Sequence, residues 1–142
     1  MTSDFSPNCP KYLKQFAIFA MESLDILRLR GNVEIEYVQG SLEDESYGCC
    51  VGDNRETTIY IASQSNGESV SREQKLKTLA HELVHAKQYL TRELISSESD
   101  EYAGRWKGKM VRENEYSHFL LPWEVEAEAA EQPIYDLWKS SL

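Results

Sequence analysis

The sequence predicts an α+β domain, and the order of its elements carries that prediction. A helical segment comes first, three short strand-like segments follow, and a long amphipathic helix and a final helix complete the chain. This order favours a small, mainly antiparallel sheet packed against helices. A chain of 142 residues has the length of a typical single domain. We therefore expect residues 1–142 to form a single domain, with residues 1–10 flexible.

The first helix is predicted over residues 11–30, where apolar residues recur every three or four positions before Gly31. Residues 32–39 then alternate apolar and acidic side chains, which is typical of a half-buried strand. Residues 40–46 are acidic and turn-like. A second short strand is predicted over residues 47–51, and a third over residues 57–62, which are rich in β-branched and aromatic side chains.

The strongest helix signal covers residues 72–94, after a polar loop over residues 63–71. Ser71 is placed to cap this helix, and Gln74 three residues later completes the pattern of a capping box. Beyond it we expect an acidic loop over residues 96–102 and an irregular segment or short hairpin over residues 106–116. Pro122 opens the final helix, because proline suits the first helical position.

Composition excludes several classes of protein. A net charge of −9 argues against nucleic acid as the main partner, since phosphate binding needs clustered Lys and Arg. No apolar run reaches the roughly 20 residues needed to cross a bilayer, and residues 1–11 lack the features of a secretory signal. The three cysteines, Cys9, Cys49 and Cys50, fit reduced thiols and a cytoplasmic location, and the alternative is a disulfide from Cys9 to Cys49 or Cys50 in an exported protein. The acidic balance permits a basic peptide substrate without requiring one.

The chemistry is concentrated in His81-Glu82-Leu83-Val84-His85, which lies inside the strongest helix. Residues four apart share one helix face, so both imidazoles can reach one metal ion. Glu82 is then placed beside the metal, where it can take a proton from a bound water molecule. This HExxH motif predicts a zinc-dependent metallopeptidase, with His81 and His85 as ligands and Glu82 as the catalytic carboxylate.

A zinc site of this kind needs a third protein ligand and one position left for water. The sequence offers candidates in the final helix, where Glu124 and Glu126 are followed by alanines that allow close helix packing. We favour Glu124 over Glu126, and His118 is a less favoured third candidate. Glu128, four residues after Glu124, is a carboxylate that could orient a ligating histidine.

The stretch from His81 to Ala127 resembles the gluzincin group of zinc metallopeptidases, in which a glutamate on a second helix is the third ligand. It is similar to a set of small bacterial and phage metallopeptidases in its HELVH motif, in Trp106-x-Gly108, in Tyr116 and in the PWEVEA run. The resemblance covers the C-terminal half only and implies a minimal zincin-like domain. The Glu-x-x-x-Asp form of the group is not kept, because Glu128 stands where Asp would be.

Catalysis of peptide hydrolysis also needs a donor for the developing oxyanion. Tyr116 is our candidate, and the resemblance includes this tyrosine. The alternative reading is a catalytically silent protein of the same fold that acts as a protein-binding module, although such a protein would not need Glu82. We expect a peptide or protein as the substrate.

Overall fold

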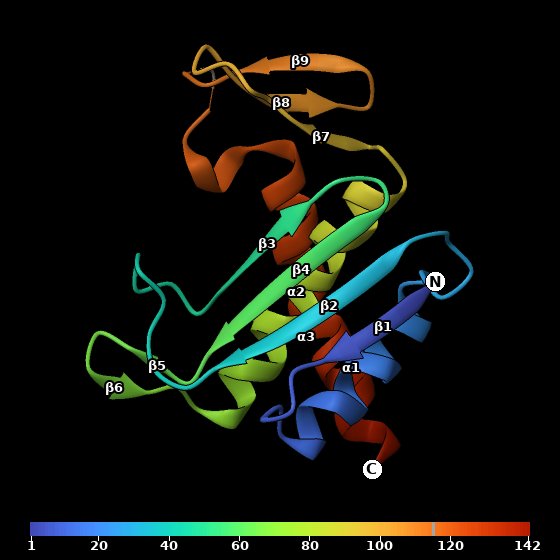
Figure 1. The fold of residues 1–142 in the computed structure, drawn as a ribbon, viewed down its shortest axis with the longest axis vertical. Helices are drawn as coiled ribbons and strands as arrows, with labels where there is room; N and C mark the ends of the chain where they lie inside the picture. Colours follow the sequence, from blue (N-terminus) through green and yellow to red (C-terminus); the bar gives the residue numbers. More distant parts are fainter. Residues whose placement is uncertain (115) are drawn as a thin grey trace.

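The computed structural model describes residues 1–114 and 116–142, and it confirms the α+β class (Figure 1). The helices are α1 (Lys11–Ser23), α2 (Arg72–Leu90) and α3 (Pro122–Ser141), with a short 3₁₀ turn η1 (His118–Leu120) before α3. The strands are β1 (Thr2–Phe5), β2 (Asn32–Val38), β3 (Gly48–Gly52), β4 (Glu56–Ala62), β5 (Gln64–Ser65), β6 (Glu68–Ser69), β7 (Leu94–Ser96), β8 (Tyr102–Trp106) and β9 (Lys109–Arg112).

The main sheet is mixed, so the expectation of a mainly antiparallel sheet was wrong for it. Its strand order is β1-β2-β4-β3, with β1 and β4 both parallel to β2 and only β3 antiparallel to its neighbour. The longer parallel pair is β2 with β4, and the N-terminus adds a second one, because Thr2–Phe5 form β1 although residues 1–10 were expected to be flexible. This strand makes β1-α1-β2 a parallel crossover unit, and a parallel pair requires such a crossover.

Helix α1 is seven residues shorter than the sequence predicted. The chain leaves the helix at Asp25, whose φ of 57° lies in the left-handed region. The amide of Ile26 then donates to the carbonyl of Met21, which satisfies an end group of the helix as in a Schellman motif. Ile26 is fully buried by this turn. Leu27, an apolar residue of the predicted helical segment, is 41% exposed.

One face of the main sheet is covered by helices, and the hydrophobic core lies between the two layers (Figure 1). Helix α2 contacts β3 and β4 directly and packs against both α1 and α3. The core combines inward-facing strand residues such as Ile35 and Ile59 with helix residues such as Phe16 and Leu83. Because α2 is central to this core, its position relative to β3 is fixed by extensive apolar packing.

Strands β7, β8 and β9 form a separate antiparallel sheet beyond the C-terminal end of α2 (Figure 1). The short hairpin expected near residues 106–116 is confirmed, but it is built from β8 and β9 and turns at Lys107 and Gly108. This sheet has its own small core with the start of α3, made of Leu94, Val111, Leu121 and Trp123.

Helix α2 begins as predicted and ends earlier. The amide of Gln74 donates to the hydroxyl of Ser71 at 3.1 Å, so Ser71 caps the helix. The Gln74 side chain donates to Thr78 rather than back to the cap, so only half of the expected capping box forms. The helix ends at Leu90, and Arg92 adopts a left-handed φ of 64° before β7 begins.

The three cysteines are free thiols, as expected. Among the described residues, no helix combines the length and apolar character that a membrane span requires.

Close approach of β3 to α2 depends on Gly48. A Cβ atom at this position would lie 2.6 Å from Cγ2 of Thr78 and 2.9 Å from the carbonyl oxygen of Tyr60. We predict that Gly48→Ala lowers the free energy of unfolding by about 1–3 kcal/mol, because the backbone must move to relieve the overlap. Val51→Ala, at a half-exposed side chain of the same strand, is the control and should change it by less than about 0.5 kcal/mol. Urea unfolding monitored by circular dichroism measures both, and equal stability of Gly48→Ala and the parent would contradict the close contact.

Candidate metal centre

Helices α2 and α3 pack side by side in opposite directions, and this arrangement assembles the site. The start of α3 lies against the C-terminal part of α2, where the Gln88 amide donates to the Trp123 carbonyl oxygen at 3.1 Å. Two turns further along α3, Glu131 lies against His81 at 3.4 Å. Ala127, between these two contacts, is fully buried and lets the helices approach closely.

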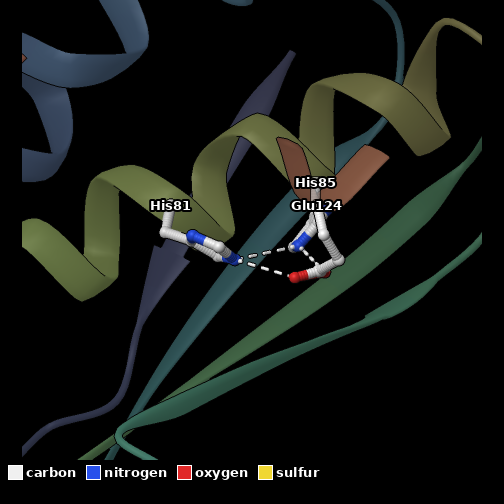
Figure 2. A group of neighbouring side chains, drawn as sticks. All are labelled: His81, His85 and Glu124. Atoms are coloured by element: carbon white, nitrogen blue, oxygen red, sulfur yellow. Dashed lines mark hydrogen bonds and ion pairs between the residues drawn. The ribbon is translucent and has the colours of Figure 1, made fainter. Parts of the chain in front are cut away.

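Three side chains converge between these helices: His81, His85 and Glu124 (Figure 2). The two histidines direct their Nε2 atoms toward each other at 3.2 Å. Glu124 Oε1 lies 2.7 Å from His85 Nε2, and Glu124 Oε2 lies 3.4 Å from His81 Nε2. One ligand atom from each residue falls within 4.8 Å of the others, so the group could hold a metal ion.

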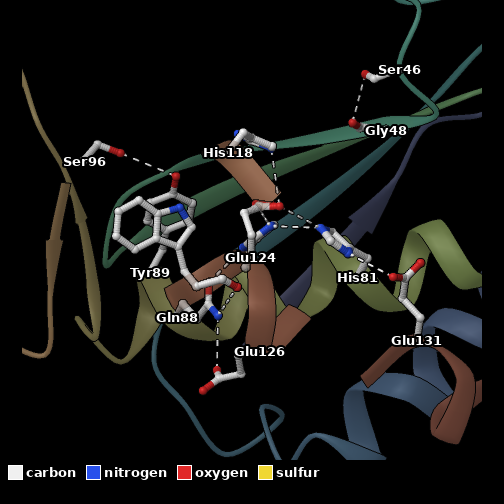
Figure 3. Close-up of polar contacts among 12 residues, drawn as sticks. Ser46, Gly48, His81, Gln88, Tyr89, Ser96, His118, Glu124, Glu126 and Glu131 are labelled. Carbon is white, nitrogen blue, oxygen red and sulfur yellow. Dashed lines mark hydrogen bonds and ion pairs between the residues drawn. The ribbon is translucent and has the colours of Figure 1, made fainter. Parts of the chain in front are cut away.

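The far side of each imidazole ring is held by a second polar side chain (Figure 3). His85 Nδ1 lies 2.8 Å from Gln88 Oε1, and His81 Nδ1 lies 3.4 Å from Glu131 Oε2. Since both partners can accept a hydrogen bond, each ring would carry its proton on Nδ1 and leave Nε2 free when a cation takes the place of protons at the Nε2 atoms. This is the tautomer that a metal ion requires of a histidine bound through Nε2.

Glu82 lies beside the three converging side chains and is 7% exposed. Among the described residues its carboxylate accepts no hydrogen bond. Burial raises the pKa of Glu82 to about 7, although the neighbouring imidazoles of His85 and His81 oppose this shift. A buried carboxyl group with a pKa near neutrality can both accept and release a proton at physiological pH.

The charges of the three converging groups are strongly coupled. Burial by itself would lower the pKa of His81, but hydrogen bonding to Glu124 and the nearby carboxylates raise it to about 9. Burial would likewise raise the pKa of Glu124, but the imidazoles of His81 and His85 hold it well below its usual range. Without a metal, protons on the histidines therefore balance the carboxylate, and a divalent cation could replace those protons.

Comparisons with protein-family models, with curated proteins and with solved structures found no match to this chain. The resemblance to gluzincins therefore stays a prediction, and the site is interpreted from its own geometry.

The converging groups line an open pocket of about 630 Å³ between α2, α3 and β3. Its walls include side chains from the loop before β3, from α2, and from the segment that leads into α3. The predicted residues His81, Glu82, His85 and Glu124 all line it. Tyr116 does not line it and is 45% exposed, so the structure does not bring the predicted oxyanion donor to the site.

The other predicted candidates occupy distinct positions. Glu126, about 200° round the helix from Glu124, faces away from the histidines and accepts a hydrogen bond from Gln88 at 3.1 Å. His118 lies 3.5 Å from Glu124 Oε2 at the exposed rim of the pocket, outside the group of three. Glu128 also lines the pocket, but Glu131, not Glu128, contacts a histidine.

Helical spacing could have identified three residues that the sequence analysis missed. Gln88 and Tyr89 follow His85 by three and four positions, so both lie near its face of α2, and Tyr89 lines the pocket. Glu131 follows Glu124 by seven positions, which is two turns along the same face of α3. The spacing shows which residues share a face of one helix, but their role at the site depends on how α2 and α3 are paired.

The raised pKa of Glu82 predicts a stability effect that depends on pH. Because the folded pKa of about 7 exceeds the ordinary 4.5, ionisation of Glu82 destabilises the metal-free protein as pH rises from about 4.5 through 7. Glu82→Gln should therefore stabilise the metal-free protein by roughly 1–3 kcal/mol at pH 8 and change it little at pH 5. Urea unfolding in excess chelator at both pH values tests this. Glu22→Gln, at an exposed position on α1, is the control for loss of one charge, and an equal effect of both changes would contradict the assignment.

Proposed function

We propose that this protein is a zinc-dependent peptidase that hydrolyses peptide bonds with water. One observation carries the proposal: the carboxylate of Glu124 meets the Nε2 atoms of both HExxH histidines, beside a buried Glu82 that has no hydrogen-bond partner among the described residues. A helix motif and a residue 39 positions after its second histidine thus supply the two histidines, the third ligand and the base that this chemistry needs.

The donor set fits zinc. Zinc takes nitrogen and carboxylate ligands at about 2.0–2.2 Å in tetrahedral geometry, which separates ligand atoms by about 3.3 Å. The separations from His81 Nε2, 3.2 Å to His85 Nε2 and 3.4 Å to Glu124 Oε2, agree with that value, whereas the 2.7 Å between His85 Nε2 and Glu124 Oε1 is a hydrogen-bond distance that would lengthen around an ion. His81, His85 and Glu124 would hold the ion, while Gln88 and Glu131 would keep the imidazoles in the required tautomer. Three protein ligands leave a fourth position for water or substrate.

When bound, zinc supplies a Lewis acid that lowers the pKa of a water molecule and polarises a peptide carbonyl. Glu82 would take the proton of the attacking water and deliver it to the departing amine, so the carboxyl group returns to its starting state. Tyr89 and His118 line the same pocket and offer hydrogen-bond donors for negative charge on the substrate.

Strand β3 supports a peptide as the substrate. It is the last strand of the sheet order, so one of its edges has no strand partner in the described residues, and it lines the pocket through Gly48, Cys49 and Cys50. An exposed strand edge pairs readily with an extended peptide through backbone hydrogen bonds. An extended substrate added to this edge would pass directly over the candidate metal ligands.

The first test of this proposal is metal binding. We expect one zinc ion per chain, and we expect Glu124→Ala to weaken binding by about a hundredfold or more, because only two protein ligands remain. Zinc titration against a competing chelator measures the affinity. Glu126→Ala and His118→Ala are matched controls and should retain most of it, since neither residue belongs to the group of three. Equal losses in all three variants would place the third ligand elsewhere.

The second test separates catalysis from metal binding. Glu82→Gln should keep zinc and the fold but lower kcat by about a thousandfold or more, because the amide cannot take the proton of the attacking water. The measurement is hydrolysis of quenched fluorescent peptides by zinc-loaded protein, with zinc content determined on the same samples. Undiminished activity of this variant would contradict the role of Glu82 as the general base.

A further inference from the structure

The pocket around the candidate metal ligands has two ends of different chemistry. Figure 3 shows Ser46, Gly48 and Glu131 on one side of the histidines and Tyr89 with Ser96 on the other. The first end carries Asp44, Glu128 and Glu131, and it lies toward the N-terminal half of α2. The second end is lined by Tyr89, Leu94, Phe119 and Trp123, and it lies toward the C-terminal end of α2.

The pocket as a whole carries more negative charge than a metal ion would balance. Five carboxylates line the pocket as a whole, and no described Lys or Arg side chain does. A divalent ion would offset two of these charges. Hydrogen bonds from the hydroxyl and amide of Ser46 hold the pKa of Asp44 below its usual range, and Glu128 is exposed without an ion pair among the described residues.

The apolar end is held in place by packing in the small core. Leu94 and Trp123 are 5% and 7% exposed and belong to the small core that joins β7 to α3, so they form a fixed floor. Phe119 is 73% exposed at the rim, although a solvated phenylalanine gains nothing for folding. Closing an apolar side chain between this floor and Phe119 would remove apolar surface from water on both partners.

From these two ends we propose a substrate class: a peptide with a bulky apolar residue immediately before the cleaved bond and a lysine or arginine immediately after it. This inference rests on the proposed peptidase function and specifies which peptides that site accepts. The apolar side chain fills the end lined by Leu94 and Trp123. The basic side chain lies between Asp44 and Glu128, where opposite charge attracts it.

The direction of the peptide follows from β3. This strand begins against Thr78, where Gly48 leaves space for the Thr78 side chain, and it runs toward the β7 end of the molecule (Figure 1). It therefore runs from the acidic end of the pocket to the apolar end. An antiparallel partner is the more stable choice for an added strand. Such a substrate runs from the apolar end to the acidic end, which places the apolar residue before the cleaved bond.

Four internally quenched peptides test the preference, with Phe-Lys, Phe-Glu, Lys-Phe or Ala-Lys at the centre of one Gly/Ser-flanked sequence. We expect zinc-loaded protein to cleave the Phe-Lys peptide between these two residues, with kcat/KM about tenfold or more above the Phe-Glu peptide. The Lys-Phe and Ala-Lys peptides should also be poorer substrates. Raising the salt concentration should reduce the advantage of Phe-Lys over Phe-Glu, because it screens exposed charges.

Charge reversal at the acidic end is the decisive variant. Glu128→Lys should lower the ratio of kcat/KM for Phe-Lys over Phe-Glu by about threefold to tenfold, as expected for an exposed charge pair. Asp44→Lys should act in the same direction. Glu22→Lys makes the same change in net charge on α1, outside the pocket, and should leave the ratio as it is.

The outcomes distinguish the two levels of the proposal. Cleavage with equal kcat/KM for Phe-Lys and Phe-Glu, a better rate for Lys-Phe, or a ratio unchanged in both charge-reversed variants would overturn the inferred specificity and leave the peptidase function standing. Failure of zinc-loaded protein to cleave any of the four, or a set of peptides with random central residues, would overturn the proposed function itself.

Discussion

The buried amide of Gln88 is the contact on which the site depends. Its side chain is fully buried, its oxygen faces Nδ1 of His85, and its nitrogen donates to the Trp123 carbonyl and to Glu126. One side chain of α2 thus fixes both the ring of a candidate ligand and the position of α3. A buried amide must satisfy its hydrogen bonds, since leaving one unmade costs roughly 1–3 kcal/mol. The two helices are therefore tied to one register, and Glu124 is placed opposite the histidines within it.

The sequence predicted the parts of the site that lie within single helices and missed those that need two elements. The HExxH motif places His81, Glu82 and His85 by helical spacing alone, and the alanines after Glu124 indicated close packing. Glu131 and Gln88 were missed, because their roles appear only when α2 and α3 are paired in opposite directions. Tyr116 was predicted from resemblance and lies outside the pocket, whereas Tyr89 lines it one turn after His85.

Most of the main helices and strands were predicted from the sequence, but the strand pairing was not. Periodicity located α1, α2 and the strand β2, composition located β4, and Pro122 indicated the start of α3; β3 was also predicted, although none of its residues is fully buried. It did not reveal β1, because a four-residue strand in a polar segment carries almost no pattern; its pairing with β2 comes from backbone hydrogen bonds. Periodicity also gave no strand order, so the parallel pairing of β2 with β4, which leaves β3 at the edge, was not predicted. The end of α1 at Asp25 was missed for a related reason, because a left-handed residue leaves little trace in hydrophobic periodicity.

Glu82 is the residue that favours a peptidase over a catalytically silent binding module. A site that only held a metal or a partner would need the histidines and Glu124, and it would gain stability from an apolar residue at position 82. The Glu82 side chain is instead only 7% exposed where it lines the pocket, and partial desolvation of a carboxylate is a cost of the kind found at functional sites. Two apolar clusters meet at this point, since α2 belongs to the main core and the start of α3 to the smaller one beneath β7. The smaller core sets where α3 begins, and Glu124 lies in the first turn of that helix, where the helix dipole also favours its negative charge. The sheet formed by β7, β8 and β9 therefore has a role at the site, although Leu94 is the one residue of these strands that lines the pocket: it anchors the end of the helix that carries Glu124, the candidate third ligand.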